Sequence, residues 1–432
     1  MQSNTSFYEK GLVMEGKAYL KLNKAGAKRY PKLKRQGFAE YIEVNQEVVD
    51  SFDVISHARR HAFAGYYDLQ NISPNGEKMF YLSVPHHASP KYNKATIHIY
   101  NTNTKNSTKI GKTSAWCWQQ GSRLRWMHGS NSKLIYNDFV QGEYISRVID
   151  VESGVVSDFA PVALYDISFV ANVGISLNFQ RLQTLRPGYG YSRGKDFTKD
   201  ILAPADDGVF AVDLKTKKVR LLYSLKELAG QVVSKPTDSH YINHISVSPD
   251  GKRFMFFHLW TKDSLDMWNM RLLVSDINGS NLVELEKNDI ISHYCWVSDD
   301  ELLVTKVSNE EPCYILYNIK QGTKTIIDDV NLIYDGHPSF LSGKKWFISD
   351  TYPLNNCIQN LFVYNIENKK YLPILQIFSD PRFYIEKRCD LHPRLNNDND
   401  IVNIDSTFSD GRRKVVIIKF KGGKLNEISR HV

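Results

Sequence analysis

No apolar run in this 432-residue sequence approaches the roughly 18 to 20 residues that a helix needs to cross a bilayer, so no transmembrane segment is predicted. The first residues, MQSNTSFYEK, also lack the apolar stretch of a secretory signal, which favours a cytoplasmic protein. Cysteine is scarce, and its five positions form no CxxC pair. A disulfide framework and a structural zinc site are therefore not expected.

Short signatures of several enzyme classes are missing too. The sequence contains no Walker loop and no HExxH motif. Gly188, Gly190 and Gly194 do not have the spacing of a GxGxxG loop, so a dinucleotide site is not expected.

The composition favours a folded protein, because 42% of the residues are hydrophobic and 12% are aromatic. The formal charge is +8, and eight lysines and arginines lie between Lys17 and Arg35 with no acidic residue among them. This basic segment is either a solvated helix face or flexible arm, or a docking patch for phosphate, a membrane or an acidic polymer.

The sequence has few long helical patterns. Short apolar strands separated by polar turns recur instead, which is typical of an all-β repeat of the WD40 and TolB kind. In the clearest copy, Pro249-Asp250-Gly251 supplies a fixed φ followed by a residue free to take positive φ, as a tight turn between antiparallel strands requires. Seven copies lie between His61 and Phe420, roughly 51 residues each. The predicted fold is a seven-bladed β-propeller.

Two domains are assigned on this basis: a basic N-terminal extension, residues 1–50, and the propeller, residues 51–432. A strand near Ser51 to Ile55 is a candidate to pair with the last blade and close the ring. The longest insertion is predicted in the third blade, from Arg186 to Asp207.

Alignment of the repeats on their first turn places four histidines in register: His244, His293, His337 and His392. Their separations of 49, 44 and 55 residues are blade lengths. The innermost strand of a blade borders the central channel, so the four are expected to converge at one channel mouth. Arg123 occupies the same register position in blade 2, and Asp68 lies one residue before the equivalent position in blade 1. Either each histidine caps a strand, or the set forms a site whose neutral imidazoles suit a general base or metal ligands.

Aromatic residues are expected mainly in packing between blades. In the predicted loops, however, Arg181, Arg186, Tyr189 and Tyr191 combine rings for stacking on sugars with guanidinium groups for bidentate binding of carboxylates. This combination favours an acidic glycan as the partner. Single-stranded nucleic acid is bound by similar residues, but no known nucleic-acid module is present, so that partner is not predicted.

Three stretches of the ring resemble the oligogalacturonate lyases: His-x-Ser-x-Ser-Pro-Asp-Gly at His244 to Gly251, Gly-His-Pro-Ser at Gly336 to Ser339, and Asp-Leu-His-Pro-Arg at Asp390 to Arg394. These enzymes are cytoplasmic β-propellers that cleave uronate oligosaccharides by β-elimination, with a histidine base at the channel mouth and a manganese ion held by histidines and a glutamine. The sequence also looks like propellers encoded with bacterial surface-polysaccharide genes.

The resemblance implies that His244 is the base and that His293 and His392 are manganese ligands. The family pattern Gln-x-x-His-x-His here reads Cys389-x-x-His392-x-Arg394, so two ligand positions differ.

The leading hypothesis is a polysaccharide or oligosaccharide lyase. β-Elimination needs a neutral base for the proton α to a uronate carboxylate, and a cation that neutralises this carboxylate. The predicted catalytic residues are His244, Arg123 and Arg394. The predicted substrate-binding residues are Asp68, Arg181, Arg186, Tyr189, Tyr191 and His337.

A non-catalytic propeller that binds glycan or protein, within a polysaccharide-assembly system, is the alternative. A glycosyl transferase or hydrolase is a third class. A hydrolase would use paired carboxylates, for which the sequence offers Asp68, Asp335 and Asp390.

Overall fold

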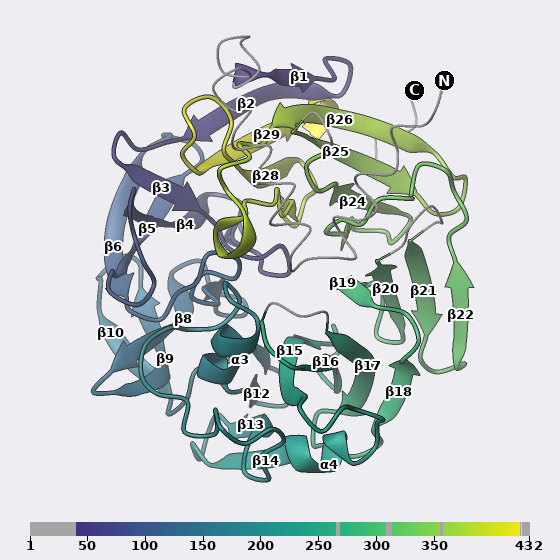
Figure 1. Cartoon of the computed structure of the whole chain (residues 1–432). Coiled ribbons are helices and arrows are strands. Elements are labelled where there is room, and N and C mark those ends of the chain that lie inside the picture. The colour runs from purple at the N-terminus through teal and green to yellow at the C-terminus, as the bar shows by residue number, and fades with distance from the viewer. Residues whose placement is uncertain (1–39, 265–267, 308–312, 355–356, 424, 426–432) are drawn as a thin grey trace.

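Seven antiparallel sheets surround a central axis in the computed structural model, which describes residues 40–264, 268–307, 313–354, 357–423 and 425 (Figure 1). The predicted seven-bladed β-propeller is confirmed. Among the residues described, no helix is long and apolar enough to cross a membrane.

The first three blades follow the chain in order from the innermost to the outermost strand. Blade 1 contains β3 (Arg60–Phe63), β4 (Lys78–Pro85), β5 (Ala95–Asn101) and β6 (Ser107–Thr113). Blade 2 contains β7 (Arg125–Trp126), β8 (Lys133–Val140), β9 (Glu143–Asp150) and β10 (Val156–Ala160). Blade 3 contains β11 (Asp166–Ser168), β12 (Val173–Ser176), β13 (Gly208–Asp213) and β14 (Val219–Ser224).

Blades 4 and 5 have the same strand order. Blade 4 contains β15 (Ser239–Val247), β16 (Arg253–Thr261), β17 (Asn269–Asp276) and β18 (Val283–Glu286). Blade 5 contains β19 (Ile291–Trp296), β20 (Glu301–Lys306), β21 (Tyr314–Asn318) and β22 (Thr323–Ile326).

The last two blades include strands from the start of the chain. Blade 6 contains β23 (Ser339–Phe340), β24 (Trp346–Asp350), β25 (Ile358–Asn365) and β26 (Tyr371–Phe378), with β1 (Ile42–Val44) paired to β26. Blade 7 contains β27 (Arg394–Leu395), β28 (Ile401–Ser406) and β29 (Lys414–Phe420), with β2 (Val49–Ile55) as its outermost strand.

Pairing of β2 with β29 closes the ring and confirms the closing strand predicted near Ser51 to Ile55 (Figure 1). Val49 and Ile55 are buried at its two ends. β1 was not predicted, and both it and the start of β2 lie within the segment assigned to the N-terminal extension. The basic segment from Lys17 to Arg35 lies outside the described residues.

The recurring turn between the first two strands of a blade has the local chemistry that its sequence predicts. In blade 4, Gly251 has a φ of 71° and its N–H donates to the Ser248 carbonyl at 2.9 Å. In blade 1, Gly76 has a φ of 74° and donates to the Ser73 carbonyl at 2.8 Å. A glycine with positive φ therefore ends the same turn in both blades.

In the part of the chain that the structure describes, four short helical elements connect or follow the strands: α3 (Phe179–Leu185), α4 (Leu225–Ala229), η2 (Ile385–Lys387) and η3 (Lys421–Gly423). α3 lies in the blade 3 insertion, which runs from residue 177 to residue 207 and so begins earlier than predicted. Asn178 caps α3, because its side-chain oxygen accepts from the N–H groups of Gln180 and Arg181.

Candidate active site

The four histidines predicted to converge are all buried, and three of them lie in contact near the ring axis. The ring centroids of His293 and His337 are 3.9 Å apart, and those of His337 and His392 are 4.4 Å apart. His244 lies beside Tyr66, whose ring stacks on it at 5.3 Å and also contacts His392 at 4.8 Å. Tyr66 thus joins the fourth histidine to the other three.

The backbone directs several of these side chains by the same unusual conformation. Arg123, His244 and His392 have φ values of 51°, 53° and 49°, in the left-handed region that non-glycine residues rarely adopt. In blade 4 the irregularity is a break in the pairing register between Asn243 and Ser246. Such conformations are concentrated at functional sites, because the surrounding structure must hold them in place.

An acceptor at Nδ1 orients each of the three clustered histidines. His293 Nδ1 is 3.0 Å from Asp335 Oδ1, and His337 Nδ1 is 2.8 Å from Asp350 Oδ1. His392 Nδ1 is 3.1 Å from the Gly65 carbonyl oxygen. With the proton at Nδ1, each ring keeps a lone pair on Nε2, which is the arrangement of a metal-binding histidine with its second-sphere acceptor.

Asp390 completes a group of three potential metal ligands with His337 and His392, whose ligand atoms all lie within 4.8 Å of one another. Asp390 Oδ2 is 3.8 Å from His392 Nε2. Among the described residues, Nε2 of His337 and Nε2 of His392 are buried without a hydrogen-bond partner. Two imidazole nitrogens and a carboxylate form a donor set that fits a divalent transition-metal ion.

This group differs from the ligand pair predicted from the resemblance. His392 belongs to it, whereas Nε2 of His293 lies 3.5 Å from the Tyr352 hydroxyl. His337, predicted to bind substrate, belongs to the group instead. Burial lowers the pKa of His244, His337 and His392 well below the usual range, which favours the neutral imidazole.

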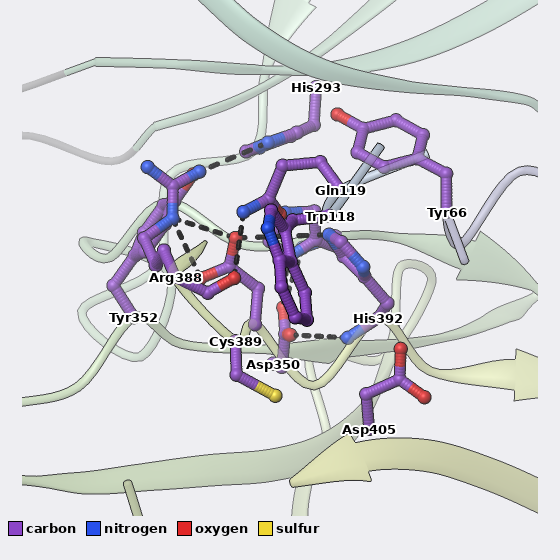
Figure 2. Close-up of polar contacts among 12 residues, drawn as sticks. Tyr66, Trp118, Gln119, His293, Asp350, Tyr352, Arg388, Cys389, His392 and Asp405 are labelled. Carbon is purple, nitrogen blue, oxygen red and sulfur yellow. Dashed lines mark hydrogen bonds and ion pairs between the residues drawn. The ribbon is translucent and has the colours of Figure 1, made fainter. Parts of the chain in front are cut away.

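Arg388 is a cation of this site that was not predicted from the sequence. Its Nε donates to both carboxylate oxygens of Asp390 at 2.9 and 2.8 Å, and one Nη donates to the hydroxyls of Tyr189 at 3.0 Å and Tyr352 at 3.3 Å. Figure 2 shows Arg388 and Tyr352 on one side of the site, His392 and Tyr66 across from them, and His293 between the two groups at the top of the view. The only sequence signal for Arg388 is its place four residues before His392.

The two arginines predicted to be catalytic are bound to other groups. Arg123 makes a bidentate ion pair with Asp68 at 2.9 and 3.0 Å, and its Nε donates to the Tyr165 carbonyl. Arg394 donates to Asp405 Oδ2 at 3.2 Å and to the carbonyls of Gly65 and Tyr66. Both guanidinium groups therefore hold the loop that carries Tyr66 and the strands around it.

The residues predicted to form a sugar platform divide into two pairs. Tyr189 lies at the site, with its ring 5.6 Å from His244, and Arg186 lies 5.3 Å from the ring of Tyr189. Arg181 and Tyr191 are buried within the insertion. Arg181 donates to four backbone carbonyls, and the hydroxyl of Tyr191 accepts from Asn137 at 2.9 Å.

The carboxylates considered for a hydrolase all have strong partners. Asp68 is paired with Arg123 and also accepts from the Tyr294 hydroxyl at 2.9 Å. Asp335 and Asp390 are paired with His293 and Arg388. A hydrolase would need two carboxylates that face each other across the substrate. These contacts do not place any two of the three carboxylates in that way.

A second feature lies at the other end of the innermost strands. A cavity of about 680 Å³ is lined there by residues of all seven blades. Asp68 faces this cavity together with Trp296, Phe340 and several amide and hydroxyl side chains. The predicted substrate-binding residue Asp68 thus faces the cavity, and its neighbour Tyr67 lines the cavity with a ring that lies 5.2 Å from the ring of His337.

Comparison with known proteins gives a fold relationship. No protein-family model matches the sequence, and no curated protein matches it. An oligogalacturonate lyase solved in complex with manganese matches with a TM-score of 0.60 at 13% identity, over 89% of this chain and 98% of that one. An oligogalacturonate lyase from Vibrio parahaemolyticus matches with a TM-score of 0.55 at 12% identity, over 88% of this chain and 98% of that one.

A puromycin-hydrolysing peptidase of Mycobacterium tuberculosis matches with a TM-score of 0.50 at 9% identity, over 84% of this chain and 53% of that one. Identities this low carry information about the fold alone. The chain therefore resembles the oligogalacturonate lyases as a seven-bladed propeller over nearly their whole length.

Proposed function

We propose that this chain is a lyase that cleaves a uronate-containing oligosaccharide or polysaccharide by β-elimination at the buried histidine cluster. The observation that carries the proposal is the pair of unpartnered, buried Nε2 atoms of His337 and His392 beside the Asp390 carboxylate. A structural cap would have satisfied these atoms.

His244 is the base in this proposal. Its imidazole is neutral because burial lowers its pKa, and a neutral imidazole can take the C5 proton of a uronate. The rings of Tyr66, Tyr189 and Tyr294 surround it. These rings supply a largely apolar wall that keeps water from competing for the base.

His337, Asp390 and His392 would hold the metal ion. A divalent cation held there would supply positive charge beside the uronate carboxylate, which makes the adjacent C5 proton easier to remove. Arg388 fixes the Asp390 carboxylate through two hydrogen bonds and orients the hydroxyls of Tyr189 and Tyr352. Its role here is to position these groups.

Three segments beside the cluster are joined to one another by hydrogen bonds. The N–H of Gln119 donates to the Gly188 carbonyl at 3.2 Å, and its side-chain amide donates to the Arg388 carbonyl at 2.7 Å. Residues 116–121, 186–191 and 385–388 are joined in this way. Closure of these segments over bound substrate would exclude water from the reaction.

The test is the absorbance of the unsaturated uronate product, followed for the full chain with a panel of uronate oligosaccharides, with added manganese and with a chelator. We expect product formation that the chelator suppresses. His244→Ala should lower kcat at least a hundredfold, whereas His87→Ala, at an exposed histidine, should not change it. Full activity of the His244→Ala protein would contradict the assignment of the base.

The cavity at the other end of the ring favours a second candidate function, a non-catalytic glycan-binding propeller. Trp296 and Phe340 are half-buried in its wall and offer rings for stacking on a sugar. Under this alternative, oligosaccharides bind without forming product, and Trp296→Ala weakens the binding measured by calorimetry. Product formation with unaltered kinetics in the Trp296→Ala protein would contradict it.

A further inference from the structure

The hydroxyl of Tyr66 is, like Nε2 of His337 and of His392, a buried polar group of the cluster without a hydrogen-bond partner among the described residues. Tyr66 has no exposed surface, and its Oη has no hydrogen-bond partner among the described residues. Figure 2 shows this hydroxyl end turned toward the His293 side of the site. A buried hydroxyl without a partner costs free energy, so it does not serve to stabilise the fold.

The backbone of Tyr66, in contrast, is firmly held. The Gly65 carbonyl accepts from His392 Nδ1 at 3.1 Å and from an Nη of Arg394, and the Tyr66 carbonyl accepts from Arg394 Nε at 3.3 Å. Gly65 itself has a φ of 108°, which a residue with a side chain would rarely adopt. The chain thus fixes the ring and leaves only the hydroxyl to interact with a ligand.

The ring of Tyr66 is stacked on His244, with centroids 5.3 Å apart and planes inclined by 19°. A sugar ring cannot fit between two aromatic rings at this separation. The hydroxyl of Tyr66 and the imidazole of His244 must therefore approach a bound sugar from the same face.

We propose that Tyr66 is the catalytic acid of the elimination, and that the site acts by syn-elimination on uronates whose C5 hydrogen and C4 oxygen lie on one face of the ring. Glucuronate and mannuronate belong to this class, whereas galacturonate and guluronate have these two groups on opposite faces. The inference rests on the proposed lyase function and narrows its substrate.

His244 takes the C5 proton, and the electron pair of the C5–H bond forms the C4–C5 double bond. The C4–O bond breaks, and the departing glycosidic oxygen takes the phenolic proton of Tyr66. Proton exchange with water then restores the tyrosine and the neutral histidine for the next cycle.

The test compares the full chain and its Tyr66→Phe variant, with manganese present, on matched oligosaccharides of the two stereochemical classes. We expect the wild-type protein to cleave the glucuronate or mannuronate oligomer, and Tyr66→Phe to lower kcat at least a hundredfold. In heavy water, Tyr66→Phe should still exchange the C5 hydrogen of the substrate, whereas His244→Ala should not.

Tyr314→Phe is the matched control, because Tyr314 is equally buried but its hydroxyl has a partner, Ser349 Oγ, at 2.8 Å. We expect Tyr314→Phe to lower the urea midpoint and keep kcat, and Tyr66→Phe to keep the midpoint and lose kcat. Cleavage of galacturonate alone, or an unchanged kcat in Tyr66→Phe, would overturn this inference and leave the lyase function standing. Absence of cleavage in every uronate would overturn both.

Discussion

Two buried carboxylates each orient a different histidine. Substitution of one or the other therefore tests whether His337 or His293 is a metal ligand. Asp350 accepts from His337 Nδ1 at 2.8 Å, whereas Asp335 lies against His293. Asp350→Asn should weaken manganese binding by roughly 10- to 100-fold, the usual effect of losing such a partner. Asp335→Asn should change it less than about threefold. Calorimetric titration of the full chain checks both, and the opposite ranking would place His293 in the ligand set.

The buried imidazole of His61 should make the protein less stable in mild acid. Its Nδ1 accepts from the Arg413 N–H at 3.1 Å, and its Nε2 donates to the His86 carbonyl at 3.0 Å. Burial lowers its pKa from 6.5 to about 4. The unfolded chain therefore binds the extra proton first, and stability falls as the pH drops from 6.5 toward 4, by about 2 kcal/mol at pH 5.

Urea unfolding at pH 7 and pH 5 measures this effect of His61. A His61→Gln protein, which cannot take up the proton, should show a smaller difference between the two pH values. An equal difference in both proteins would mean that other groups cause the acid sensitivity.

Membership of the site could be predicted from the sequence only for residues that recur at one position of the repeat. Register alone located His244, His293, His337 and His392. The register does not reveal that Asp390 faces His337 and His392. The family pattern has its ligand at the neighbouring position, which is Cys389 here. Tyr66 and Arg388 lie in loops, and their contacts with the cluster come from parts of the chain remote in sequence.

Among the individual elements, the blade 3 insertion depends on close packing at one glycine. A Cβ at Gly190 would lie 2.1 Å from the Phe179 carbonyl oxygen and 2.3 Å from the Gln183 nitrogen, both in α3. Gly190→Ala should therefore separate the segment from α3 and lower the free energy of unfolding by about 1 to 3 kcal/mol. Activity should fall as well, because Tyr189 is the preceding residue.

Gly230→Ala is the control for this substitution. The nearest atoms to its Cβ would be 3.6 Å away, an ordinary contact. Its urea midpoint should match the wild-type value. Equal midpoints for the two variants would show that the insertion adapts to the added methyl group.

The strands were easier to predict than this insertion. Strand and turn chemistry repeat seven times, so each copy supports the others. The insertion occurs once, and its helix is only seven residues long, Phe179–Leu185, held by the Asn178 cap and by contacts of Arg181 with remote carbonyls. Short helices of this kind depend on tertiary contacts, which no local pattern reveals.

At the scale of the whole molecule, closure of the ring by β2 predicts that the free energy of unfolding drops when the first strands are removed. A protein starting at residue 40 retains β1 and β2, and one starting at residue 57 lacks both. The shorter protein should lose roughly 3 to 6 kcal/mol from the burial of Val49 and Ile55 alone. Equilibrium unfolding of the two proteins measures the difference. Equal stability would show that three strands suffice for blade 7.

The count of seven blades and the closing strand followed from the repeat length and from the need to pair the edge of the last blade. The attachment of β1 to blade 6 had no such requirement. Its three residues, Ile42–Val44, extend a sheet that is already four strands wide, and so short a segment carries no periodic signal.

The placement of β1 and β2 also affects how the protein is made. Both strands leave the ribosome before any blade is complete. Val49 cannot pair with Phe420 until about 370 further residues have been synthesised. At ordinary translation speeds this interval lasts about 20 to 75 s. Throughout it the nascent chain carries two strands without partners, so the newly made protein is most open to misassembly before its final blade is synthesised.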